Sequence, residues 1–128
     1  MADIELEAGM KAEREVKVEK KHLASGSGIP GADVLSTPSM IEVMELACYD
    51  AVQGALPPGY VTVGTFVNVR HLKMTPAGDN VRAEAVLEKA DGAKLLFSVK
   101  ASDSEGEIGR GEHGRFAVNA EKFFAPLK

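Results

Sequence analysis

The chain has 128 residues and a mass of 13.6 kDa, which predicts a single domain spanning residues 1–128. Its 15 Lys and Arg against 19 Asp and Glu give a net charge of −4, which argues against a nucleic-acid-binding protein. One cysteine excludes an internal disulfide and a multi-thiolate metal site. No apolar run approaches the eighteen or so residues of a membrane helix, and the N-terminus lacks the regions of a signal peptide. We therefore expect a cytoplasmic protein with no metal, nucleic-acid or membrane partner.

The N-terminal segment contains the first expected strand. Arg14, Val16 and Val18 alternate with charged residues, and a period of two is typical of a half-exposed strand, although a charged helix remains open. Residues 25–31 (SGSGIPG) follow, and their glycines and proline predict an irregular, mobile loop.

Residues 37–55 form the most strongly indicated helix. Thr37 is expected at the N-cap with Pro38 at the first helical position, and Gly54 with the following prolines ends the pattern. The expected apolar stripe, at a spacing of 3.6 residues, comprises Met40, Met44, Ala47, Cys48, Ala51 and Ala55. A helix of this length extends about 28 Å, so several strands are needed to cover it.

The rest of the chain has the pattern of strands over residues 60–75, 81–89, 94–102 and 107–118. Asp91 and Gly92 predict a hairpin between the second and third of these strands. In the first of them, one face is expected to carry Val61, Val63, Thr65, Val67, Val69 and His71. One strand, one long helix and four further strands predict an α+β fold whose sheet covers the helix.

Four polar residues interrupt the apolar patterns and are candidates for chemistry. Glu45 flanks the apolar arc of the helix and suits a general base, although a solvated position explains it equally well. His71 ends the valine-rich strand and either reaches water or contacts a substrate. Thr37 is explained by helix capping, and a functional hydroxyl there would lie at the positive end of the helix. His113 lies among glycines of the last strand and is either structural or near a ligand.

Three motifs resemble those of one known family. The segments 34–48 (VLSTPSMIEVMELAC), 63–71 (VGTFVNVRH) with 75–78 (TPAG), and 107–113 (EIGRGEH) with 121–123 (EKF) are similar to hot-dog thioesterases related to fluoroacetyl-CoA thioesterase. The similarity extends over nearly the whole chain from about residue 10. It implies a hot-dog fold, in which one long helix is wrapped by a curved antiparallel sheet of about five strands.

The same resemblance implies an activity and a set of site residues. It implies hydrolysis of an acyl-CoA thioester to the free acid and CoA, without a cofactor, in a homodimer with its sites at the subunit interface; dimer and tetramer are both left open. The catalytic residues carried over are Thr37, Glu45 as base or nucleophile, and His71. The N–H groups of Ser39 and Met40 are expected to help Thr37 polarise the carbonyl, and His113 is a weaker candidate for substrate contact.

Two observations qualify this interpretation. Thr37 and Glu45 are eight residues apart, about 12 Å along a continuous helix, so a folded-back loop or a partner subunit must bring them together. The stretch 28–35 lacks the phenylalanines that gate the fluoroacetyl-specific enzyme, so selectivity for a fluorinated acyl group is not implied.

A non-catalytic module that binds acyl-CoA or another small ligand is the main alternative. A hydratase ranks last, because no histidine occurs between residues 23 and 70.

Overall fold

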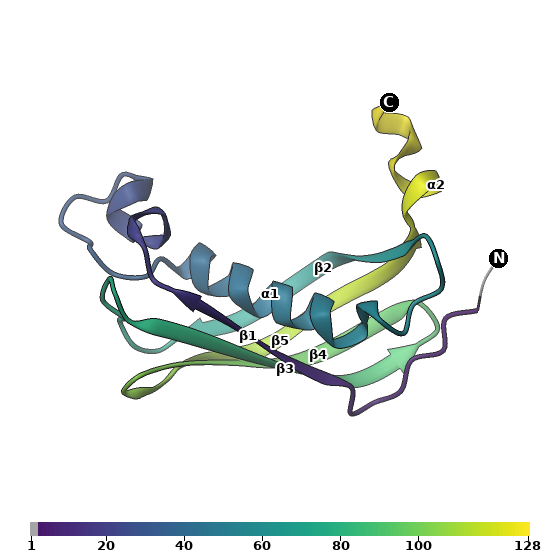
Figure 1. Cartoon of the computed structure of the whole chain (residues 1–128), viewed down its shortest axis with the longest axis horizontal. Coiled ribbons are helices and arrows are strands. Elements are labelled where there is room, and N and C mark those ends of the chain that lie inside the picture. The colour runs from purple at the N-terminus through teal and green to yellow at the C-terminus, as the bar shows by residue number, and fades with distance from the viewer. Residues whose placement is uncertain (1–2) are drawn as a thin grey trace.

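A computed structural model describes residues 3–128 and shows one long helix lying across a five-stranded sheet (Figure 1). The strands are β1 (Lys11–Lys17), β2 (Tyr60–His71), β3 (Asn80–Asp91), β4 (Lys94–Asp103) and β5 (Gly106–Asn119). The helices are α1 (Thr37–Gln53), a short α2 (Ala120–Phe124), and three 3-10 turns at Lys20–His22, Ala24–Ser27 and Ala125–Leu127. The expected order of one strand, one long helix and four strands is confirmed.

The sheet is antiparallel throughout, with the strand order β1-β3-β4-β5-β2. Strands β3, β4 and β5 follow one another as hairpins, and the first hairpin turns after Asp91 as expected. The sheet curves around α1, which is the hot-dog arrangement (Figure 1). Strand β2 lies at one edge, and it pairs only with β5 among the described residues.

The core lies between α1 and the inner face of the sheet. On the sheet side it contains alternate residues of β3 and β4, such as Leu87 and Phe97, which are fully buried. On the helix side the buried residues are Met40, Val43, Met44, Ala47, Cys48 and Val52. The expected stripe is thus corrected in part: Ala55 lies beyond the helix end, and two valines complete the buried face instead.

Two local expectations are also corrected. The N-cap of α1 is Ser36, whose hydroxyl accepts the Ser39 N–H, so Thr37 is the first helical residue and Pro38 the second. The expected loop after β1 includes a 3-10 turn at Ala24–Ser27, which ends at Gly28 in the left-handed conformation.

Strand β2 does not present one continuous face. Its register against β5 shifts between Gly64 and Phe66, which marks a β-bulge at Thr65. Before the bulge, Thr62 and Gly64 face the helix; after it, Val67, Val69 and His71 do. The bulge therefore splits the face predicted for residues 61–71 and turns His71 toward the start of α1.

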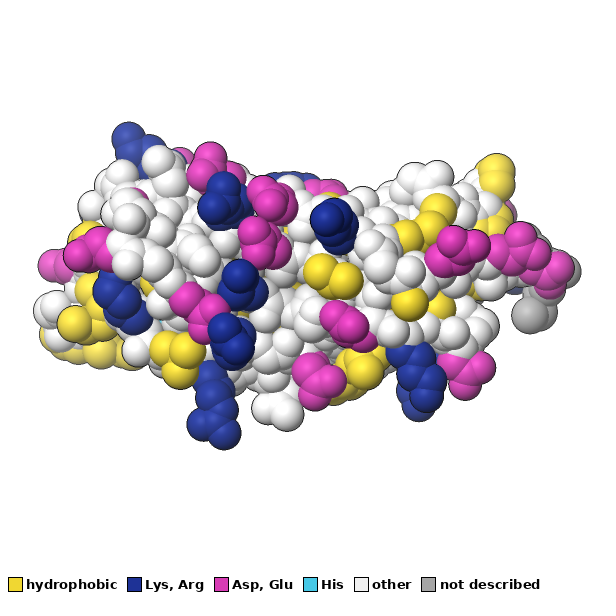
Figure 2. All heavy atoms as spheres, turned by 90° about the horizontal axis from the view of Figure 1, so that it is seen from below, with side chains coloured by type: hydrophobic (Ala, Val, Ile, Leu, Met, Phe, Trp, Pro, Cys, Tyr) yellow, Lys and Arg dark blue, Asp and Glu magenta, His cyan; other side chains and the backbone are white. Residues whose placement is uncertain are grey.

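The outer face of the sheet carries acidic and basic side chains in close alternation (Figure 2). Cross-strand pairs include Glu13 with Arg82 and Glu84 with Lys100. Such exposed pairs contribute little stability, but their mixed signs leave no strongly charged patch on this face. Within residues 3–128, none of the helices has the length and apolar character needed to cross a membrane.

Candidate active site

Thr37 and His71 meet where α1 begins and β2 ends. The Thr37 Oγ1 and His71 Nδ1 atoms are 2.8 Å apart, a hydrogen-bond distance. This contact is possible because Ser36 caps the helix and leaves the hydroxyl of Thr37 available. Burial lowers the pKa of His71, so the imidazole is neutral at pH 7. Its other nitrogen, Nε2, is buried without a partner among the described residues.

The expected role of the Ser39 and Met40 N–H groups is corrected by the structure. The Ser39 N–H donates to Ser36 Oγ at 3.1 Å, and the Met40 N–H donates to Ser36 O at 3.0 Å. Met40 is also fully buried in the core. Since Pro38 has no N–H, the first turn keeps one amide, that of Thr37, for which residues 3–128 supply no hydrogen-bond acceptor.

A cavity of about 700 Å³ opens beside the Thr37–His71 pair. Its walls come from the segment before α1 (Ala24 to Pro38) and from the end of β2 with the residues that follow it (His71 to Met74). The volume lies within the range of small-molecule sites. Thr37 and His71 therefore lie in the wall of a largely apolar pocket.

Glu45 lies in a second polar cluster, two turns further along α1. Its Oε2 atom is 3.8 Å from His113 Nε2 and 3.7 Å from Arg115 Nη1, both of which project from β5. Its side chain is 44% exposed, whereas those of His113 and Arg115 are buried. Gly64 of β2 lies against this carboxylate: a Cβ there would be 3.2 Å from Glu45 Oε2. A glycine at this position thus leaves space next to the carboxylate.

His113, the weaker candidate for substrate contact, has both ring nitrogens engaged within the chain, and its contact with a substrate stays a prediction. Its Nδ1 donates to Phe66 O at 2.8 Å, so Nε2 carries a lone pair, which accepts from Arg115 Nη1 at 3.1 Å. Burial lowers the pKa of His113 and keeps it neutral. With both ring nitrogens engaged, His113 links the bulged edge strand to Arg115.

Arg115 is the member of this cluster that sequence reasoning missed. Its guanidinium donates to Thr62 Oγ1 at 2.7 Å and Thr62 O at 2.6 Å, and burial lowers its pKa while Glu45 opposes that shift. The available signal was its position: in a strand where residues 113, 115 and 117 share the inner face, an arginine faces the core. A buried cation of this kind holds the Glu45 carboxylate near it.

The two clusters are separate within one chain. No ion pair joins Glu45 to His71 anywhere in residues 3–128, and each contacts different partners. Thr37 and Glu45 lie on the same uninterrupted helix, about 12 Å apart along its axis. The single chain therefore brings together Thr37 and His71, but not Glu45 and His71.

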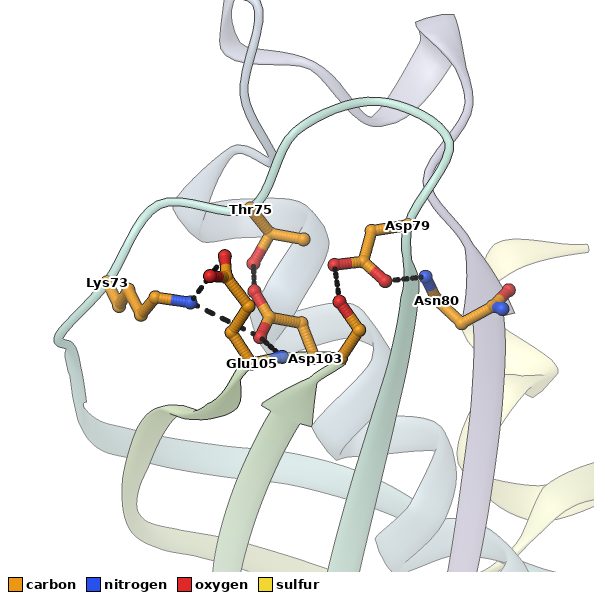
Figure 3. A network of polar contacts seen from close by, with 7 residues as sticks. Lys73, Thr75, Asp79, Asn80, Asp103 and Glu105 are labelled. Atoms are coloured by element: carbon orange, nitrogen blue, oxygen red, sulfur yellow. Dashed lines mark hydrogen bonds and ion pairs between the residues drawn. The ribbon is translucent and has the colours of Figure 1, made fainter.

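A buried carboxylate fixes the loop after His71 (Figure 3). Asp103, whose side chain is fully buried, accepts the Thr75 hydroxyl at 2.8 Å and the Glu105 N–H at 2.8 Å, with the Lys73 ammonium at 3.4 Å. The carbonyl of Thr75 in turn accepts the N–H of Leu35, two residues before Thr37. The loop is thus attached on one side to the β4–β5 turn and on the other to the segment that leads into α1.

Comparison with known proteins identifies the family of the chain. Residues 18–121 match the family described as fluoroacetyl-CoA-specific thioesterase. The fluoroacetyl-CoA thioesterase of Streptantibioticus cattleyicolor is 38% identical over 96 residues, which are 75% of this chain and 69% of that protein. The chain belongs to the fluoroacetyl-CoA-specific thioesterase family.

Solved structures of the family confirm the fold. A fluoroacetyl-CoA thioesterase structure superposes with a TM-score of 0.86 at 30% identity, covering 96% of each chain. A variant of that enzyme in complex with fluoroacetate and CoA gives 0.85 at 31% identity, covering 92% of this chain and 99% of the other. A thioesterase superfamily member from Thermus thermophilus gives 0.87 at 28% identity, covering 96% and 91%.

Proposed function

We propose that this protein hydrolyses acyl-CoA thioesters, with the Thr37 hydroxyl, oriented by His71, binding the thioester carbonyl and Glu45 acting as base or nucleophile. The observation that carries the proposal is the Thr37–His71 hydrogen bond at the wall of a cavity, at the start of the central helix, in a chain of a thioesterase family. The free Thr37 N–H and the positive end of α1 suit stabilisation of an oxyanion there.

Two chemical routes follow from a carboxylate at position 45. As a base, Glu45 removes a proton from water while the water oxygen bonds to the carbonyl carbon; the C–S bond then breaks, and the CoA thiolate takes up a proton. As a nucleophile, the Glu45 oxygen bonds to the carbonyl carbon and expels the thiolate, and water then cleaves the mixed anhydride. Both routes give the free acid and CoA. Quenching a single turnover and searching for acyl-Glu45 by mass spectrometry separates them, because only the second route forms a covalent intermediate; ¹⁸O from labelled water enters the enzyme carboxylate only if water attacks the Glu45 carbon of that anhydride.

A homodimer through β2 supplies the contact that one chain lacks. The middle of this edge strand is exposed, including Phe66 at 46% and Val67 at 42%, and a bare apolar edge is a pairing site. We infer that two copies of β2 pair antiparallel about these two residues, with both helices on the same face of a continuous sheet. That register sets Gly64 opposite the partner's Val69. The partner's His71 is two residues further along the same strand, a distance of about 7 Å. Glu45, which lies against Gly64, then faces the Thr37–His71 pair of the partner subunit.

Substitutions at the two clusters test the activity. We expect Glu45→Ala and His71→Ala each to lower kcat/KM by at least about a hundredfold, measured by thiol release from a panel of acyl-CoA esters. Glu42→Ala is the matched control, because Glu42 is an exposed carboxylate on the same helix, and it should retain near-normal activity. If folded wild-type protein releases no thiol but is still stabilised thermally by acyl-CoA, the protein is a binding module instead.

Mixing the two inactive variants tests the shared site. In a mixed dimer of Glu45→Ala and His71→Ala chains, one site carries both substitutions and the other carries neither, if each site takes Glu45 and His71 from different chains. Random exchange of subunits should then restore about a quarter of wild-type activity. If activity does not recover while mass spectrometry shows mixed dimers, both residues act within one chain.

A further inference from the structure

The walls of the cavity beside Thr37 carry large apolar side chains that are left exposed. Ile29 is 57% exposed, Leu72 is 55% exposed and Met74 is 71% exposed. Ile29 comes from the loop before α1, whereas Leu72 and Met74 follow β2, so the side chains converge from two segments on one pocket. Exposed apolar clusters of this kind mark binding surfaces for apolar groups.

Two polar side chains of the same walls are already engaged within the protein. The Ser36 hydroxyl caps α1, and the Lys73 ammonium points to the Asp103 and Glu105 carboxylates at 3.4 Å each (Figure 3). Lys73 is the one permanently charged side chain among the described residues of the lining. An anionic acyl group would therefore lose its water in this pocket, and the one cation of the described lining, Lys73, already pairs with two carboxylates.

The size of the cavity also bears on the substrate. About 700 Å³ is the liquid volume of roughly twenty water molecules, and an acetyl group fills only a small part of that space. An acyl chain of several carbons, extending from a carbonyl held at Thr37, would reach the exposed apolar side chains.

We propose that the cavity selects an uncharged aliphatic acyl chain of several carbons, with Ile29 and Met74 as specificity-determining residues. This rests on the proposed thioesterase activity and adds the substrate class to it. The occupant is the acyl chain of the substrate, because the pocket is continuous with the Thr37–His71 pair that is proposed to hold the carbonyl. Each methylene buried from water against these walls should raise kcat/KM by about threefold to fourfold.

The first experiment is a substrate series. We expect kcat/KM to rise from acetyl-CoA through butyryl-CoA to hexanoyl-CoA, by about eightyfold or more over the four added methylenes. Succinyl-CoA has the same number of acyl carbons as butyryl-CoA but ends in a carboxylate, and it should be hydrolysed at least about tenfold less efficiently. If acetyl-CoA or succinyl-CoA is the best substrate, or if chain length has no effect, the substrate class is wrong while the thioesterase activity stands. If no ester is hydrolysed, the proposed function fails and this inference fails with it.

The second experiment assigns the effect to the walls. Ile29→Ser and Met74→Ser should each lower kcat/KM for hexanoyl-CoA by about fivefold to tenfold and leave acetyl-CoA within about twofold. Leu127→Ser is the matched control, because Leu127 is 83% exposed but lies outside the pocket. Equal losses for both esters, or a preference for hexanoyl-CoA that survives both substitutions, would overturn the assignment. So would a change of oligomeric state on size exclusion, which would show that a second copy of the chain covers these side chains.

Discussion

Asp103 offers the sharpest test of what holds the loop after His71 in place. Asp103→Ala removes a fully buried carboxylate that accepts the Thr75 hydroxyl and the Glu105 N–H. Thr75 is itself fully buried, so water cannot replace the lost acceptor, and a hydrogen bond to a charged group is worth about 1.5–3 kcal/mol. The Glu105 N–H lies in an exposed turn and should add about 0.5–1 kcal/mol. We expect the free energy of unfolding to fall by about 2–4 kcal/mol.

Urea denaturation at pH 7 measures this loss, and two variants bracket it. Asp103→Asn keeps one oxygen for the Thr75 hydroxyl and should lose about half as much. Glu105→Ala removes the exposed carboxylate that shares Lys73 and should change the free energy of unfolding by less than about 0.5 kcal/mol. A loss below about 1 kcal/mol for Asp103→Ala would refute the reasoning, because it would mean that the buried carboxylate does not anchor the loop.

The effect of Asp103 should also depend on pH. Burial alone would raise the pKa of Asp103, but the hydrogen bonds from Thr75 and Glu105 and the charge of Lys73 outweigh it and hold the pKa below its ordinary value. A lowered carboxyl pKa stabilises the fold above the unfolded-state pKa of about 4, and the stabilisation is lost as pH falls through the lower, folded-state value. The difference in unfolding free energy between wild type and Asp103→Ala should be constant from pH 7 to about 5 and should narrow below about 4. A constant gap down to pH 3 would contradict this prediction.

Three further predictions follow from buried groups. Gly109→Ala should lower the free energy of unfolding by about 1–3 kcal/mol, because the added Cβ would lie 2.6 Å from Met40 Sδ. Gly54→Ala is the control and should not lower it, because Gly54 has open space around it and a helical φ of −67°. Equal effects of the two substitutions in chemical denaturation would refute the packing argument. Burial raises the pKa of Cys48 to about 12, so the native thiol should stay unreacted with a disulfide reagent at pH 8 and react after unfolding; prompt labelling of folded protein would contradict its place in the core. Burial lowers the pKa of His71, so kcat/KM should be level from pH 7 to 8 and fall only below about pH 6.5 as the imidazole takes up a proton; an acid limb centred above pH 7 would refute the neutral Thr37–His71 pair.

The α+β class and the order of the elements were predictable from the sequence because their signals are local, whereas the hot-dog fold and the family were identified from motif resemblance. The hairpin after Asp91 and the order of the elements depend on turn residues and on periods of 2 and 3.6, which neighbouring residues fix by themselves. The choice of Thr37, Glu45 and His71 as site residues came from family resemblance, and the contact between Thr37 and His71 came from the structure. The structure supplied its physical basis, which is that Ser36 rather than Thr37 caps the helix.

Tertiary structure decided the remaining parts of the site. The bulge at Thr65 reverses which side of β2 faces the helix, and an alternating sequence does not mark where such a shift occurs. Arg115 reaches Glu45 across 70 positions of the chain, because the pairing of β5 with β2 brings it under α1. The sequence by itself determined which elements form and which polar residues are candidates for the site. Only the folding of the sheet around the helix decided which of those residues meet, since strand register and burial depend on contacts between distant parts of the chain.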